Sequence, residues 1–390
     1  MNLESGFGDE TNVTYTFRKK AEEPPPLPHE AVTNVLSKKE QQVPVVAEVA
    51  QSVEIRVGQE FTDQHGVKFR ILEKLGEGGM GGVYKVTDER TGLTRAIKFI
   101  KADIRGQEST VARFRREIYF VGLVNSSYVL KAEDAGTYTV GGEEMAGLVT
   151  EVVDSSLDRE LKFDRKLKPD RIAVLMGQLL LGLEDLRKAG VVHRDIKPEN
   201  IYLQKLSDGQ TLLKIGDFGM AKRSSDAPEL SEAQTAKLIH EGIGKPIENV
   251  TEGGLLGGTP VYMAPEYAKG QPPNHRNDLY SAGILMCKLV TEHTPFEKTK
   301  DLNDLFRAKQ NDDPPTFEQL GVENVPDWLK KIAFKLLESD PNKRYQTAGE
   351  AFQELNTAVA KQYPELKYKI PFEYFTNEQT YGDAQQSRAA

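Results

Sequence analysis

Apolar and polar residues alternate in three short stretches of the first half of the chain, at residues 67–72, 83–87 and 95–100. Alternation with a period of two, bounded by glycine-rich or polar turns, predicts an antiparallel meander of strands. Helical spacing over 111–123 interrupts the strands, and two more strands are expected at 128–138 and 145–153. The first part of the chain is therefore predicted to be β-rich with one helix.

The pattern becomes helical from residue 169 onward. Apolar residues from Ile172 to Leu186 recur at helical spacing, with Pro169 placed to open the segment and Gly190 placed to end it. Further helices are expected at 278–290, 304–309 and 326–337. A β-rich part followed by an α-rich part predicts an α+β, bilobal fold: a small antiparallel β lobe with one helix and a larger, mainly helical lobe, with a cleft between them.

These two lobes are predicted to occupy residues 67–355, the small one at about 67–153 and the large one at about 154–355. Residues 1–60 form a polar leader whose run Pro24-Pro25-Pro26-Leu27-Pro28 favours an extended path, and we interpret it as a flexible linker or, alternatively, a docking site for a partner. The tail, 356–390, contains Phe372-Glu373-Tyr374-Phe375. For this tail, docking and incidental packing or disorder both stay open.

Composition narrows the class of protein. The 390 residues include 51 Lys and Arg against 59 Asp and Glu, a net charge of −8, which argues against coating of nucleic acid or binding to anionic membranes. Cys287 is the only cysteine, so an intrachain disulfide and a cysteine-based zinc site are excluded. No apolar run reaches the roughly 18 residues of a membrane span, so none is predicted. A reducing, cytoplasmic setting fits best.

A glycine cluster follows the first predicted strand. Gly76-Glu77-Gly78-Gly79-Met80-Gly81 matches G-x-G-x-x-G, a pattern in which backbone N–H groups can approach phosphate oxygens without side chains in the way. A Rossmann nucleotide turn would open a helix, whereas this sequence continues as a β-hairpin. A phosphate-covering hairpin and a merely tight hairpin both remain open at this point.

Two further patterns bear chemically useful side chains. Lys98 lies between apolar residues of a predicted strand, and Glu117 lies in the following helical stretch, where it could hold the lysine against phosphates. The strongest pattern is His193-Arg194-Asp195-Ile196-Lys197-Pro198-Glu199-Asn200, followed by Asp217-Phe218-Gly219. Asn200 and Asp217 offer the oxygen ligands that Mg²⁺ prefers, and Asp195 is then available to accept a proton from an alcohol. Each residue alone is more simply a turn, a cap or a surface charge; the ordered set favours catalysis.

At this point the sequence resembles the eukaryotic-like serine/threonine protein kinase family, over about residues 67–355. The form of the glycine loop is most similar to the bacterial branch. The resemblance implies an ATP- and Mg²⁺-dependent enzyme that transfers the γ-phosphoryl group to Ser/Thr hydroxyls of protein substrates. The residues it implies for ATP binding are Leu75, Gly76, Glu77, Gly78, Gly79, Met80, Gly81, Gly82, Val83, Ala96, Lys98, Glu151 and Val153.

The resemblance also implies individual roles. Asp195 orients the substrate hydroxyl and accepts its proton, Lys197 neutralises charge on the transferring group, and Asn200 and Asp217 carry the metal ion. Supporting roles fall to Glu117 beside Lys98, Arg194 toward a phosphorylated segment, Thr259 near the acceptor, Glu266 paired with Arg344, and Asp278 under the catalytic-loop backbone. An ordinary helix N-cap is the alternative for Asp278.

The segment from Asp217 to Glu266 is longer than the family usually has. We expect control by phosphorylation or autophosphorylation there, because an arginine at the position of Arg194 often binds such a phosphate. Thr251 is the preferred acceptor, ahead of Thr259, Thr235, Ser231, Ser224 and Ser225. Two other functions were weighed: a non-catalytic pseudokinase scaffold, which the retained Lys98, Asp195, Asn200 and Asp217 disfavour, and a small-molecule phosphotransferase, which the 258–266 block disfavours.

Overall fold

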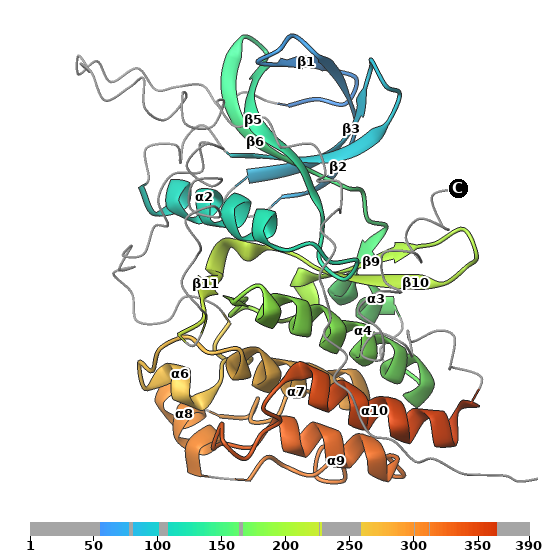
Figure 1. The fold of residues 1–390 in the computed structure, drawn as a ribbon, viewed down its shortest axis with the longest axis vertical. Coiled ribbons are helices and arrows are strands. Elements are labelled where there is room, and N and C mark those ends of the chain that lie inside the picture. The colour runs from blue at the N-terminus through green and yellow to red at the C-terminus, as the bar shows by residue number, and fades with distance from the viewer. Residues whose placement is uncertain are drawn as a thin grey trace, which may run out of the picture.

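The protein, examined as a computed structural model, folds into a β lobe and a helical lobe (Figure 1). The structure describes residues 55–77, 81–100, 108–163, 167–225, 227, 259–299, 301–311 and 313–364. The proline run of the leader and the aromatic run of the tail, both considered above as docking segments, lie outside these residues.

The β lobe is a closed antiparallel barrel with the strand order β1-β2-β3-β4-β6-β5. Its strands are β1 (Glu60–Asp63), β2 (Lys68–Glu77), β3 (Gly81–Asp88), β4 (Thr94–Ile100), β5 (Ala132–Val140) and β6 (Glu143–Thr150). Successive side chains of a strand point to opposite faces, and in β2 this sends Phe69 and Ile71 into the interior of the barrel. The neighbouring Lys68 and Arg70 are exposed.

Aromatic rings fill the middle of the barrel. Phe61, Phe69, Phe99 and Tyr138 come from four different strands, and their ring centroids lie 5.3–6.0 Å apart. Most of these pairs meet edge to face, the arrangement that aromatic quadrupoles favour. The barrel therefore has its own core, which fixes the position of each strand that bears a site residue.

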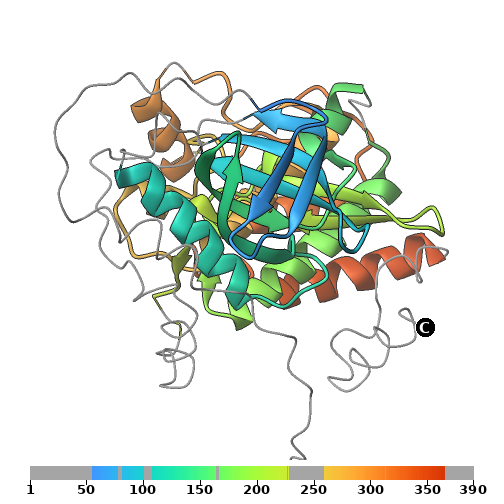
Figure 2. The same cartoon turned by 90° about the horizontal axis from the view of Figure 1, so that it is seen from above.

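Helix α2 (Glu108–Leu123) packs along the outside of this barrel (Figure 2). Its residues Phe114 and Ile118 are buried in a cluster with Ile100 of β4 and Leu148 of β6. These residues, four apart, lie on one face of the helix, which directs that face to the sheet.

The second lobe is mainly helical and contains the larger core. Its helices are α3 (Leu157–Phe163), α4 (Pro169–Lys188), α6 (Pro265–Ala268), α7 (Arg276–Thr291), α8 (Leu302–Asn311), α9 (Asp327–Leu336) and α10 (Ala348–Gln362). Short strands join them: β7 (Ser155–Ser156), β8 (Val191–Val192), β9 (Ile201–Lys205), β10 (Thr211–Ile215) and β11 (Lys222–Arg223), with single helical turns η2 (Pro198–Asn200) and η3 (Phe218–Met220). None of the helices in the described part of the chain combines the length and apolarity needed to cross a bilayer.

The predicted fold class is confirmed, and the differences lie at the margins. As expected, Pro169 opens α4, and Gly190 follows its end with a left-handed φ of 67°. The folded region was predicted to run from residue 67 to residue 355, whereas β1 lies before it and α10 continues to Gln362. Helices α3 and α10 were not predicted, and β5 begins later than predicted, at Ala132.

Candidate active site

A lysine of the barrel and a glutamate of α2 form a buried ion pair. Lys98 Nζ lies 2.7 Å from Glu117 Oε2 and 3.0 Å from Oε1. Lys98 is held in register because it pairs with Val83 of β3 on one side and Leu148 of β6 on the other. Burial opposes the charged form of Lys98, but the carboxylates of Glu117 and Asp217 outweigh it, so the pKa of Lys98 is raised. The lysine is therefore a fixed positive charge between the two lobes.

The glycine-rich hairpin is formed by β2 and β3. Gly76 pairs with Val83 and Glu77 with Gly82, and a β-bulge lies just before this point. Gly81 is required sterically, because a Cβ there would lie 1.7 Å from the carbonyl oxygen of Phe99. Leu75 lies on β2 and Ala96 on the adjoining β4, whereas Gly78, Gly79 and Met80 lie outside the described residues.

Residues after β6 connect the two lobes. Glu151 N donates to the carbonyl of Lys131 at 3.2 Å, and its side chain accepts from Lys131 N and contacts Lys214 Nζ, both at 2.8 Å. Lys214 lies on β10 of the second lobe, so Glu151 holds the segment between the lobes against that strand. Val153, two residues on, is half-buried.

The backbone of the loop after β8 is hydrogen-bonded to one aspartate of α7. Asp278 Oδ2 accepts from His193 N at 2.7 Å, and Oδ1 accepts from Arg194 N at 2.8 Å. Arg194 has a φ of 70°, a left-handed conformation that is costly for a residue with a side chain and that these two hydrogen bonds help to hold. Asp278 lies within the first turn of α7, and the alternative of an N-cap is wrong, because His275 is the N-cap.

Asp195 is the centre of a small hydrogen-bonded network. Its Oδ2 accepts from Asn200 Nδ2 and contacts Lys197 Nζ, both at 2.8 Å. Its Oδ1 is buried and has no hydrogen-bond partner among the described residues. Buried polar atoms normally have a partner in a folded protein, so Oδ1 is the oxygen of this carboxylate that could accept from an external donor.

Lys197 links this network to the segment before α6. Its Nζ donates to Thr259 Oγ1 at 2.9 Å while remaining 2.8 Å from Asp195. Thr259 is the first described residue after the gap at 228–258. Thr259 is therefore linked through the side chain of Lys197 to Asp195, the residue with the unpaired Oδ1.

Asn200 is linked through the backbone to Gly216, the residue before Asp217. Gly216 N donates to the carbonyl of Asn200 at 2.9 Å, which brings the start of the Asp217 segment against η2. Asn200 Nδ2 donates to Asp195, so its amide oxygen is the atom left to act as a ligand. Asp217 has a φ of 62° and accepts from Gly219 N at 3.3 Å. The described residues contain no group of three or more His, Cys, Asp or Glu that could enclose a metal ion. Two oxygen donors without a full cage fit Mg²⁺, which takes its other ligands from phosphates and water.

Two guanidinium groups contact the backbone just after Asp217. Arg116 of α2 donates to the carbonyl of Gly219 at 3.1 Å, and Arg194 donates to that of Met220 at 3.2 Å. Arg116 was not singled out from the sequence, although it adjoins Glu117. Because one arginine comes from each lobe, these bonds join α2 to the segment that begins at Asp217.

Only some of the predicted phosphorylation sites lie among the residues that the structure describes. Thr251, Thr235 and Ser231 lie outside the described residues, as does most of the long segment that contains them. Ser224 is buried and Ser225 is exposed.

The Glu266–Arg344 pair is buried and bidentate. Arg344 Nη1 and Nη2 donate to the two oxygens of Glu266 at 2.6 and 2.7 Å, and the Arg344 side chain is 0% exposed. Asn277 Nδ2 also donates to Glu266, at 2.7 Å. This pair joins the start of α6 to the loop before α10.

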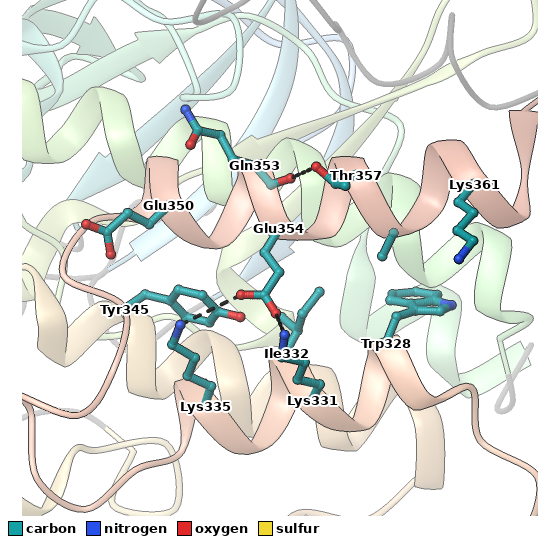
Figure 3. Close-up of a pocket in the computed structure, with 11 residues that line it drawn as sticks. Trp328, Lys331, Ile332, Lys335, Tyr345, Glu350, Gln353, Glu354, Thr357 and Lys361 are labelled. Carbon is teal, nitrogen blue, oxygen red and sulfur yellow. Dashed lines mark hydrogen bonds and ion pairs between the residues drawn. The ribbon is translucent and has the colours of Figure 1, made fainter.

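A groove of about 660 Å³ lies elsewhere, between α9 and α10 (Figure 3). Trp328 and Tyr345 line it, and Glu354 lies between Lys331 at 2.7 Å and Lys335 at 3.7 Å. It contains none of the residues described above, so it is not the site that the sequence patterns predict.

The comparisons with known proteins agree with this arrangement. Residues 69–356 match the family described as "Protein kinase domain". The chain is 34% identical over 286 residues to a "Probable serine/threonine-protein kinase" of Streptomyces coelicolor, covering 73% of this chain and 39% of that protein. It is 29% identical to the serine/threonine-protein kinases pkn3 of Myxococcus xanthus and PknB of Mycolicibacterium smegmatis, covering 76% and 74% of this chain. The matches span 50% and 43% of those two proteins, so the chain spans half or less of the length of these relatives.

Proposed function

The chain belongs to the protein kinase family, and on that premise we propose that it transfers the γ-phosphoryl group of ATP to serine and threonine hydroxyls of proteins. The relatives named as serine/threonine-protein kinases support this reaction class. The observation that carries the proposal is the unpaired Asp195 Oδ1, held near Lys197 and Thr259 in a network that includes Asn200, one of the two metal-ligand candidates.

On the nucleotide side, Lys98 binds the α- and β-phosphates. Its raised pKa keeps it charged at neutral pH, and Glu117 fixes the direction of its ammonium. Backbone N–H groups of the glycine-rich hairpin contact the phosphates from above, because glycines allow close approach. Val83 and Ala96 line the adenine pocket, and the backbones of Glu151 and Val153 hydrogen-bond the base.

Asn200 and Asp217 would hold Mg²⁺ through their side-chain oxygens. When bound, the ion would supply positive charge that balances the charge spreading over the transferring group. The amide of Asn200 is oriented for this role because its Nδ2 donates to the carbonyl and to Oδ2 of Asp195.

On the acceptor side, Asp195 Oδ1 accepts the hydroxyl proton as the acceptor oxygen bonds to phosphorus and the bond to the β-phosphate oxygen breaks. Lys197 and Asn200 already occupy Oδ2, so the carboxylate presents a single oxygen to the substrate. Lys197 also lies where it can neutralise charge on the transferring group. Groups of this kind commonly contribute about a hundredfold in rate each.

Regulation by phosphorylation of the segment after Asp217 is part of the proposal. Arg194 lies against the start of this segment, and a phosphate bound to its guanidinium would order the backbone that follows. Thr251 remains the preferred acceptor and lies outside the described residues.

Transfer of thiophosphate tests the reaction directly. The purified chain is incubated with Mg²⁺, the γ-thio analogue of ATP and casein, and labelled sites are mapped by mass spectrometry. We expect label on serine and threonine of casein and on the long segment of the chain itself, with none in Asp195→Asn. Absence of label on protein, despite measurable nucleotide binding, would instead favour a non-catalytic scaffold.

A further inference from the structure

A buried lysine of α8 contacts the loop that follows Thr259. Lys309 is 1% exposed, and its Nζ donates to the carbonyl oxygens of Pro260, Val261 and Met263 at 2.9, 2.6 and 2.8 Å. An ammonium has three N–H donors, so all three are used on one short loop.

The same loop is held at its remaining carbonyl by another core side chain. Ser281 Oγ of α7 donates to the carbonyl of Tyr262 at 2.8 Å. The carbonyls of residues 260–263 are therefore all bound by side chains from the helices beneath, three of them by Lys309. Turn hydrogen bonds inside the loop, Tyr262 N to Thr259 O at 2.9 Å and Met263 N to Pro260 O at 3.2 Å, complete its internal structure.

Burying this charge is costly, so a packing role alone does not explain a lysine here. Burial lowers the pKa of Lys309 to about 7, and Glu266 nearby opposes that effect. The rings of Tyr280 and Phe306 lie 5.4 and 5.7 Å from Nζ, and their cation–π attraction is weaker than the three hydrogen bonds. An apolar side chain would fill the space, but it would leave the carbonyls of Val261 and Met263 without the donor that Lys309 supplies.

The other side of the loop is partly exposed, and its first residue is linked to Asp195 through Lys197. Thr259, Pro260 and Val261 are each half-buried, so they present a surface while their carbonyls face Lys309. Thr259 in turn binds Lys197, which lies 2.8 Å from Asp195. The position of this loop thus determines what approaches the unpaired oxygen of Asp195.

We propose that Lys309 is a positioning residue that fixes the loop of residues 259–263 as the binding surface for the protein acceptor. The inference rests on the proposed kinase function and extends it to the source of acceptor affinity. The acceptor is a Ser- or Thr-containing segment lying against this loop. Losing the three hydrogen bonds weakens acceptor binding and leaves the nucleotide side intact, because Lys309 contacts no residue assigned to ATP.

Kinetics of three variants test this assignment. The acceptor is the synthetic Ser/Thr peptide that the wild-type chain phosphorylates best, and KM and kcat are measured for peptide and for ATP. We expect Lys309→Met to raise the peptide KM by about tenfold or more while the ATP KM stays within about twofold. Lys309→Arg, which keeps charged donors, should recover most of the loss. Arg307→Met, on the same helix but 69% exposed, is the matched control and should behave as wild type.

Hydrogen exchange provides a readout that does not depend on activity. Amides of the peptide covering 259–267 should exchange faster in Lys309→Met than in wild type, while those of β3 and β4 stay unchanged. If Lys309→Met does not fold, Lys309→Gln replaces it, and its KM values and the amide exchange of residues 259–267 are measured in the same way. An unchanged peptide KM with unchanged exchange would overturn the proposal, as would an equal rise in the KM values of peptide and ATP. A wild-type chain that transfers nothing would defeat the proposed function, and exchange would still decide the role of Lys309.

Discussion

Arg344 uses every hydrogen-bond donor that a guanidinium has. Nη1 and Nη2 each donate to Glu266, Nε donates to the carbonyl of Glu338 at 2.6 Å, and the remaining two donors reach the carbonyls of Arg276 at 3.1 Å and Ser339 at 3.2 Å. Five donors meeting five acceptors, at a side chain that is 0% exposed, make this residue the junction of three segments of the helical lobe.

Arg344→Met removes all five bonds and leaves Glu266 buried, with the hydrogen bond from Asn277 still in place. Removing one member of a buried pair typically costs about 3–5 kcal/mol, a large share of the roughly 5–15 kcal/mol that stabilises a domain. Arg344→Lys supplies three donors for five acceptors, so at least two acceptors lose their bond, but it keeps a positive charge beside the buried Glu266. Because methionine leaves that carboxylate without a counter-charge, lysine should be the less damaging of the two replacements.

Urea unfolding measures this loss. With a slope of about 3 kcal/mol per M, Arg344→Met should lower the midpoint by about 1–2 M without a change in slope. Adding Glu266→Gln to Arg344→Met should cost less than it costs alone, because the pair is already broken. Arg307→Met, at an exposed pair, is the control and should leave the midpoint unchanged. A midpoint for Arg344→Met equal to that of wild type, or strict additivity in the double variant, would refute the reasoning.

The remaining predictions concern the reaction and its pH dependence. Asp195→Asn should lower kcat by about a hundredfold or more while affinity for a fluorescent ATP analogue stays within about twofold; turnover near that of wild type would show that Asp195 is not the proton acceptor. Lys98→Met should lower kcat/KM for ATP by about a hundredfold. The pKa of Lys98 is raised above its ordinary value of 10.5, so deprotonation of this lysine should cause no loss of wild-type activity at or below pH 10.5. Burial raises the pKa of Asp185 to about 6, with Ser126 and Lys188 opposing, so the folded protein binds this proton more tightly than the unfolded chain does, and stability should fall as pH rises from about 4 to about 6. Asp185→Asn should flatten that part of the dependence of the urea midpoint on pH, and an identical slope in both proteins would contradict the assignment.

Much of the site could be predicted because its residues carry their signal in sequence order. The spacing of Lys98 and Glu117 and the cluster from His193 to Asn200 are informative without coordinates, since the chemistry requires those residue types together. The structure places Glu117 within 2.7 Å of Lys98, and Asp278 accepts hydrogen bonds from the backbone of His193 and Arg194.

Other features could not be read in this way, for physical reasons. Lys309 shares a helix face with the buried Leu305 and Phe306, and a lysine in such a position is ordinarily read as a polar residue at the edge of the face. Its role depends on carbonyls some fifty residues earlier, which no local pattern reveals. Strand β1 is four residues long, too short for a periodic signal. Helix α10 had a usable signal that was overlooked, because Thr347 accepts from Glu350 N as an N-cap with glutamate three residues on.

The closure of the barrel by β1 has a consequence for partners of the small lobe. β1 pairs with residues 68–70 of β2 and with residues 138–140 of β5, so the backbone groups at these positions are already bonded and a peptide cannot add a strand there. Helix α2 bears Glu117, which binds Lys98, and Arg116, which binds the segment after Asp217, so a partner that moved α2 would act on both contacts.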